Sequence, residues 1–127
     1  MSTQSQQSEI IIKVFIDNKP YEIDCDTGIQ DVAWLALSAC YLYGQETYPI
    51  TTYLPIMAKN KQGQILHPKL VILQNRQLIG DEINIKVKRK FGTIGSELSP
   101  EEEDWYDNAF GQGRFMRTVS AYLKPVN

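Results

Sequence analysis

The segment that most constrains the fold is Leu78–Lys90, LIGDEINIKVKRK, in which apolar and polar residues alternate after a Gly-Asp turn. Because successive side chains of a strand point to opposite faces, this alternation predicts a strand with one buried and one solvated face. The apolar side chains are Ile83, Ile85 and Val87, and the polar ones are Asn84, Lys86 and Lys88. We therefore expect the last strand of a small, half-buried sheet.

A β-hairpin is predicted near the amino end. Ile10–Ile16 alternates in the same way, with every second residue apolar. Asp17-Asn18-Lys19-Pro20 then supplies turn residues, and Tyr21–Asp24 returns as a second strand. Further along, Tyr53–Lys59 predicts a third strand, in which Pro55 indicates an edge position or an irregular start because proline cannot donate to a neighbouring strand. The short apolar runs 65–66 and 70–73 are expected to be short strands or one strand interrupted by His67-Pro68.

A single helix is predicted over residues 29–42. Thr27 and Gln30 have the spacing of a capping box, which satisfies free backbone amides at a helix start, and Gly44 is a natural stop. The apolar positions have the spacing of a helix face that packs on a sheet. They are Ile29, Val32, Ala33, Ala36, Leu37 and Cys40.

The hairpin, the capped helix and LIGDEINIKVK together resemble a ubiquitin-like β-grasp domain over about residues 10–90. The resemblance implies an α+β fold, with one main helix on a four- or five-stranded mixed sheet whose last strand lies between its neighbours. The centre of the core would contain Ile12, Val14, Ile83 and Ile85.

The resemblance does not extend to the chemistry of ubiquitin or of the β-grasp ferredoxins. Ubiquitin and the sulfur carriers act through a terminal Gly-Gly, whereas here the strand continues into Lys90-Phe91-Gly92-Thr93. The ferredoxins use four cysteines to hold their cluster, and this chain has two. We therefore expect neither conjugation nor an iron–sulfur centre.

Three segments are expected along the chain. Residues 1–9 would be a polar tail that is disordered or ordered by a partner, and residues 10–91 the β-grasp body. Residues 92–127 would contain a hinge, a short acidic helix and an aromatic docking tail. The helix start is indicated by Ser99 as N-cap, Pro100 at the first position and Glu102 at the capping-box position, and Gly111 would end the helix.

Composition excludes several functions. The 43% hydrophobic and 22% charged residues are typical of a globular protein, and no apolar run is long enough for membrane insertion. The amino end lacks the features of a secretory signal. Cys25 and Cys40 are too few for a disulfide framework, and His67 has no companion ligands, so we expect an intracellular, cytoplasmic protein without metal or cofactor.

No arrangement of a nucleophile with its base is present in the sequence. Asp24, Asp26 and Asp31 cluster at the helix start, where capping explains them better than acid–base catalysis does. Gly111-Gln112-Gly113 lacks the flanking strand and helix of a phosphate loop, and is interpreted as a flexible joint. We therefore expect the protein not to be an enzyme.

Two sets of aromatic side chains are candidates for binding. Trp34, Ser38 and Tyr41 share a helix stripe that points away from the sheet, where they would contact a partner, be covered by the chain's own tail, or simply be half-exposed surface side chains. The tail itself is too aromatic for a solvated linker. Its candidate partner-binding residues are Trp105, Tyr106, Phe110, Phe115, Met116 and Tyr122.

A basic patch on the last strand leaves three alternatives. It could be a solvated face, it could pair with a protein partner or with the acidic run 101–104 of the chain's own tail, or it could bind nucleic acid. The near-neutral net charge of −2 argues against nucleic acid. The patch consists of Lys86, Lys88, Arg89 and Lys90.

The sequence thus predicts a non-enzymatic ubiquitin-like adaptor or structural subunit of a multi-protein assembly, such as a cytoskeletal or axonemal one, anchored by its aromatic tail. The alternative is a binding module for RNA or an acidic surface, which would use the basic strand.

Overall fold

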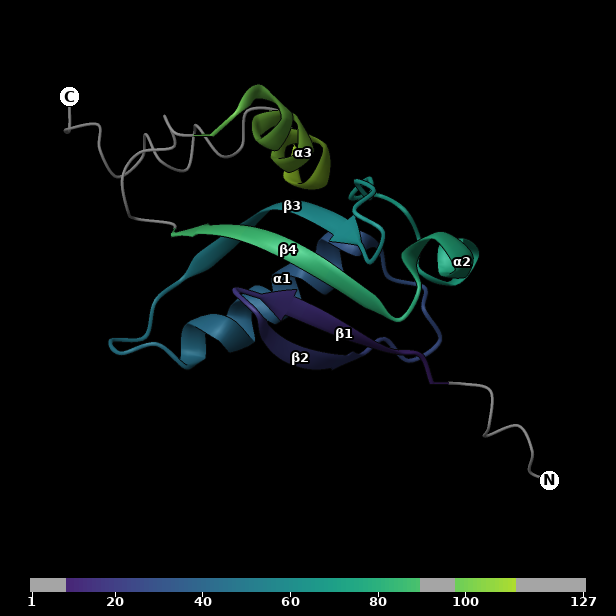
Figure 1. Cartoon of the computed structure of the whole chain (residues 1–127), viewed down its shortest axis with the longest axis horizontal. Coiled ribbons are helices and arrows are strands. Elements are labelled where there is room, and N and C mark those ends of the chain that lie inside the picture. The colour runs from purple at the N-terminus through teal and green to yellow at the C-terminus, as the bar shows by residue number, and fades with distance from the viewer. Residues whose placement is uncertain (1–8, 90–97, 112–127) are drawn as a thin grey trace.

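The computed structural model describes residues 9–89 and 98–111 and shows a mixed sheet with a long helix across one face (Figure 1). The sheet has four strands in the order β2-β1-β4-β3. The elements are β1 (Ile11–Ile16), β2 (Lys19–Asp24), α1 (Val32–Gln45), β3 (Tyr53–Asn60), a 3-10 turn (Leu73–Asn75), α2 (Arg76–Ile79), β4 (Glu82–Arg89) and α3 (Pro100–Phe110).

The strand pairing confirms the predicted ubiquitin-like β-grasp fold. β4 lies between β1 and β3, parallel to the first and antiparallel to the second. β1 and β2 form the predicted hairpin, joined by a two-residue turn in which Asp17 and Asn18 both have positive φ. Such a turn matches the twist of the strands and fixes the register in which Ile16 pairs with Lys19.

The main core lies between the sheet and α1. Its centre is formed by the four predicted residues, Ile12, Val14, Ile83 and Ile85, which are all buried. The side chains that α1 contributes are Val32, Ala33, Leu35, Ala36, Ala39 and Cys40. Leu35 and Ala39 therefore face the sheet, whereas Leu37, which we had placed on this face, is exposed.

The predicted start of the helix is wrong by several residues. The N-cap is Asp31, whose Oδ1 accepts a hydrogen bond from the Trp34 N–H at 2.9 Å. The preceding segment is not helical, because it pairs with residues 70–73, for example through the Ile72 N–H donating to the Gln30 carbonyl. Ile29 lies in this segment with 73% of its surface exposed and takes no part in the core.

The region between β3 and β4 contains no strand and ends in two short helical turns. Ile65 forms an isolated bridge with Lys59, and Val71 forms one with Asp31, but neither run is a strand. Leu73–Asn75 and Arg76–Ile79 are short helical turns instead. The apolar residues of this region, Leu66, Ile72 and Ile79, close one end of the core.

β3 is buried over most of its length because α3 packs against it. Its register pairs Met57 with Lys86 and Leu54 with Lys88, so these apolar side chains share the face opposite to the one that α1 covers. Tyr106 of α3 forms a second apolar cluster with Leu54 and Ile56. The continuous apolar run of β3 is thus explained by a helix on each side.

Candidate functional site

An apolar groove runs between β2 and the outer face of α1. Large apolar side chains remain exposed along α1, with exposed fractions of 36% for Trp34, 41% for Leu37, 66% for Tyr41 and 39% for Leu42. The groove has a volume of about 630 Å³. It is lined by Glu22, Ile23 and Asp24 of β2 and by Trp34, Leu37, Ser38, Tyr41 and Leu42 of α1.

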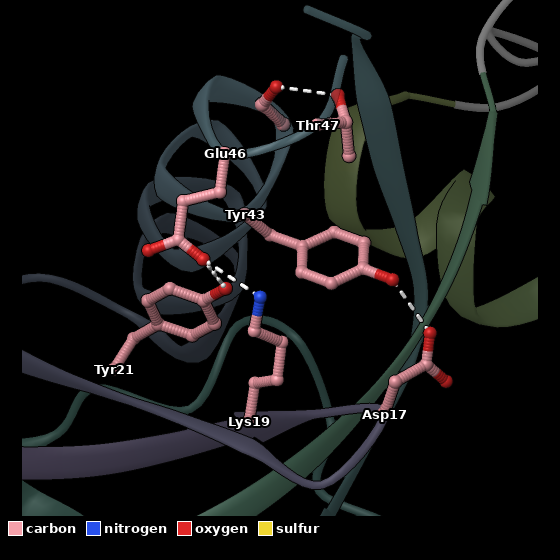
Figure 2. Close-up of polar contacts among 7 residues, drawn as sticks. Asp17, Lys19, Tyr21, Tyr43, Glu46 and Thr47 are labelled. Carbon is pink, nitrogen blue, oxygen red and sulfur yellow. Dashed lines mark hydrogen bonds and ion pairs between the residues drawn. The ribbon is translucent and has the colours of Figure 1, made fainter.

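The two walls of the groove are fastened together at one end (Figure 2). The Tyr21 hydroxyl of β2 donates a 2.7 Å hydrogen bond to Oε1 of Glu46, the C-cap residue of α1. Lys19 forms an ion pair with the same oxygen at 3.0 Å. These contacts lower the pKa of the Glu46 carboxyl, first through Tyr21 and then through Lys19. The distance between β2 and α1 is therefore set by side chains outside the groove.

A second contact holds the hairpin turn against α1. The Tyr43 hydroxyl donates to Oδ2 of Asp17 at 2.6 Å (Figure 2), and the hydrogen bond, with a contribution from burial, raises the pKa of Tyr43 to about 12. The Tyr43 ring packs edge-on against Tyr21 and lies 4.8 Å from the Tyr53 ring, centroid to centroid. α1, β2 and the start of β3 thus share one aromatic cluster.

The charge at the groove has a single sign. Of the residues that line it, Glu22 and Asp24 are acidic and none is basic. Both acids are exposed and lie on the sheet face opposite α1, because Ile23 between them points into the core. The groove therefore combines an apolar wall on α1 with an acidic rim on β2.

The sequence identified part of this surface. Trp34, Ser38 and Tyr41 do lie on the predicted outer stripe of α1, and α3, far from them, does not cover them. Leu37 and the acidic rim were missed. The signal for Leu37 was present, because Trp34, Leu37 and Tyr41 follow the i, i+3, i+7 spacing of one helix face.

The aromatic side chains of α3 that the structure describes pack on the chain's own sheet. The Ser99 capping box and Pro100 start the helix as expected. However, Trp105 and Tyr106 are 3% and 4% exposed, and the Trp105 indole donates a 2.8 Å hydrogen bond to the Leu66 carbonyl. Phe110 packs on Tyr106. These side chains contact the chain's own β3 rather than the Trp34 and Tyr41 surface, and their role in binding a partner stays a prediction. Phe115, Met116 and Tyr122 lie outside the described residues.

The basic strand is partly neutralised by α3. The Lys86 ammonium donates to Oε2 of Glu102, one of the acidic residues proposed for such pairing. Burial acts to raise the pKa of Glu102, but the hydrogen bonds from Lys86 and Ser99 together outweigh it and lower that pKa. Lys88 also has a partner, and Arg89 is exposed. Lys90 lies outside the described residues.

A second hollow of about 1010 Å³ runs along the carboxyl half of β4. Its charges have both signs, and Lys86 and Glu102, which line it, are paired with each other. Its apolar lining residues, such as Met57 and Val87, are interspersed with these charged side chains, whereas the groove has one continuous apolar wall and one sign of charge.

The potentially reactive side chains have structural roles. Burial raises the pKa of the Cys25 thiol to about 11 and that of Cys40 to about 12, so neither is a thiolate at neutral pH. His67 accepts a hydrogen bond from the Lys69 N–H within its own turn. Asp31 caps α1, and Asp24 accepts from the Asp26 N–H. Within residues 9–89 and 98–111, no three potential ligands come together as a metal site would need.

Comparison with known proteins adds the following. No family model matches the chain. No curated protein sequence matches it either. Among solved structures, it is similar to the ubiquitin-like domain of EccD5 from Mycobacterium xenopi, at 8% identity and a TM-score of 0.43, over 64% of this chain and 93% of that one. In the part of the chain that the structure describes, no helix has the length and apolar character to span a membrane.

Proposed function

We propose that this protein is a non-enzymatic ubiquitin-like interaction module, acting as an adaptor or structural subunit of an intracellular multi-protein assembly, and that it binds its partner through the groove between β2 and α1. The observation that carries the proposal is the exposure of four large apolar side chains along one stripe of α1: Trp34, Leu37, Tyr41 and Leu42.

The chemistry of this stripe is that of a binding surface. Tryptophan and tyrosine bury a large area at a low cost in side-chain entropy, and they are enriched at the energetic centres of interfaces. Single exposed apolar residues are ordinary, but a contiguous set beside a groove is typical of an interaction site. The clamp from Tyr21 to Glu46 favours binding further, because a preformed groove loses little entropy when it is filled.

The packing of α3 changes the anchor that we propose. Trp105 and Tyr106 are part of the domain core, so they would reach a partner only if α3 detached from β3. Phe115, Met116 and Tyr122 remain proposed as a second contact. The binding of RNA or an acidic surface by the basic strand is not favoured, because Lys86 is engaged by Glu102.

Affinity purification with matched variants tests this function. The bait is the full chain, compared with a double variant, Leu37→Asp and Tyr41→Ala, that introduces a charge and removes a ring at the groove. Both residues are exposed, so the variant should keep the melting temperature of the parent. We expect the proteins that the parent retains to be lost from the variant.

Two controls decide the interpretation. Ile29→Asp changes an equally exposed apolar residue away from the groove and should retain the same proteins. A chain that ends at Gly111 tests the contribution of the remaining tail. If the groove variant retains its partners at the parental yield while the shortened chain loses them, the groove is not the binding site and the tail is.

A further inference from the structure

We propose that the groove accepts an extended segment of a partner protein, which adds to the free edge of β2 and carries apolar residues alternating with lysine or arginine. This inference rests on the proposed function and deepens it, because it specifies the conformation and the chemistry of the bound segment.

The edge of β2 is available for pairing. β2 is the outermost strand, and the register shows which of its backbone groups point outwards. Ile16 and Lys19 close the two-residue turn and exchange hydrogen bonds, so the pairs alternate from there, and Glu22 and Asp24 fall at the positions that do not bond to β1. Their N–H and C=O groups therefore point away from the sheet, along the groove.

The opposite edge of the sheet is not available in the same way. On β3, the Ala58 carbonyl accepts from the Leu66 N–H, and the Asn60 N–H donates to the Gln64 carbonyl. α3 packs beside the rest of that strand.

Pro20 limits the addition at β2, because it lacks an N–H in the outward position. A short segment opposite 21–24 would thus use the outward groups of Glu22 and Asp24.

The side chains on each face of such an added strand would meet different neighbours. On the face towards α1 they would contact Trp34, Leu37 and Tyr41, which requires apolar residues. On the opposite face they would lie beside the carboxylates of Glu22 and Asp24, and opposite charges on neighbouring strands attract. Because strand side chains alternate between faces, the bound segment should alternate apolar and basic residues. Lys13 of β1 lies opposite Glu22 on this face, whereas Asp24 lies opposite Ile11, so acidic charge remains at the edge and favours basic residues in the partner segment.

A fluorescent synthetic peptide provides the probe. It has the length of β2, six residues, with valine and lysine alternating, and is titrated against the full chain at physiological ionic strength. A second peptide has the same composition with all valines before all lysines. A third has glutamate in place of lysine. We expect the alternating valine and lysine peptide to bind about tenfold more tightly than the block-order peptide or the glutamate peptide. Two favourable cross-strand pairs of about 0.7 kcal/mol each would give this difference.

Variants locate the peptide. Glu22→Lys should weaken its binding, whereas Glu101→Lys, the same change on the exposed start of α3, should not. The decisive readout is amide exchange by NMR, in which strand addition should slow exchange of the Glu22 and Asp24 N–H groups. A peptide that binds without slowing these two amides, or equally well in its block order, overturns strand addition.

Failure of this inference is distinguishable from failure of the proposed function. If Leu37→Asp with Tyr41→Ala abolishes capture of the native partner but no extended peptide binds, the groove is the site and its occupant is not a strand. If the chain ending at Gly111 binds the peptide about tenfold more tightly than the full chain, the chain's own tail competes for the groove, and the assignment to a partner segment is overturned.

Discussion

At the scale of single residues, one buried and one exposed hydrogen bond fix the parts of the fold that the hydrophobic pattern leaves open. The Trp105 indole joins α3 to the Leu66 carbonyl, and the Tyr43 hydroxyl joins α1 to the hairpin turn at Asp17. Each links segments far apart in the chain. Tyr43→Phe removes the donor and keeps the ring, whereas Trp105→Phe removes the donor together with part of a buried ring system.

Replacing Trp105 by phenylalanine should destabilise the domain by at least about 1–3 kcal/mol, because the buried Leu66 carbonyl would lose its partner and the smaller ring would leave a cavity in the core. Chemical denaturation followed by circular dichroism measures the change. Trp34→Phe is the matched control and should stay within about 0.5 kcal/mol of the parent. Equal stability of the two variants would show that Trp105 does not hold α3 in place.

The Tyr43 phenol should have a pKa of about 12, because its hydroxyl donates a hydrogen bond to Asp17 and because burial opposes ionisation. A pKa raised by folding contributes stability fully below the ordinary tyrosine value of about 10, and that contribution is lost as the pH rises through the folded value. Tyr43→Phe should thus be less stable than the parent at neutral pH, with the gap closing towards pH 12. Ultraviolet titrations of the parent and of Tyr43→Phe give the pKa of Tyr43 by difference. An ordinary tyrosine pKa of about 10 would contradict the hydrogen bond to Asp17.

At the scale of elements, the ends of α1 show what the sequence could and could not predict. Thr27 and Asp31 are both acceptable N-caps, and local pattern favoured the first. The choice of Asp31 depends on the pairing of the preceding residues with 70–73, which no local pattern contains. By contrast, α3 starts as predicted, because Ser99, Pro100 and Glu102 lie within one turn and satisfy one another.

Gly44 was predicted to end α1, but it lies inside the last turn of that helix. A methyl group there would lie 2.0 Å from the Thr51 carbonyl oxygen, so the loop that returns to β3 needs glycine for its close approach. Gly44→Ala should destabilise the domain by about 1–3 kcal/mol despite the better helix propensity of alanine, because the backbone at Thr51 must move away from the added methyl group. Gln45→Ala, at the exposed next position, is the control for urea denaturation. A Gly44→Ala protein as stable as the control would mean that the loop is not held there.

At the scale of the whole molecule, the candidate site was only half predictable. Period-two and helical patterns identify surfaces one element at a time, so they found the outer stripe of α1. They could not assign the aromatic residues of α3, since an apolar helix face is the same whether it packs on its own domain or on another. The cue was the unbroken apolar run in β3, which needs covering on both faces. Once α3 is assigned to that role, the groove beside β2 is the apolar surface of the described residues that we propose for a partner.

Hydrogen–deuterium exchange of the full chain with and without its captured partner tests this most directly. Binding should slow exchange in β2 (Lys19–Asp24) and in the part of α1 that lines the groove. Exchange in α3 (Pro100–Phe110) should stay the same, because that helix is already part of the core. Slower exchange in α3 or along β4, with β2 unchanged, would contradict it.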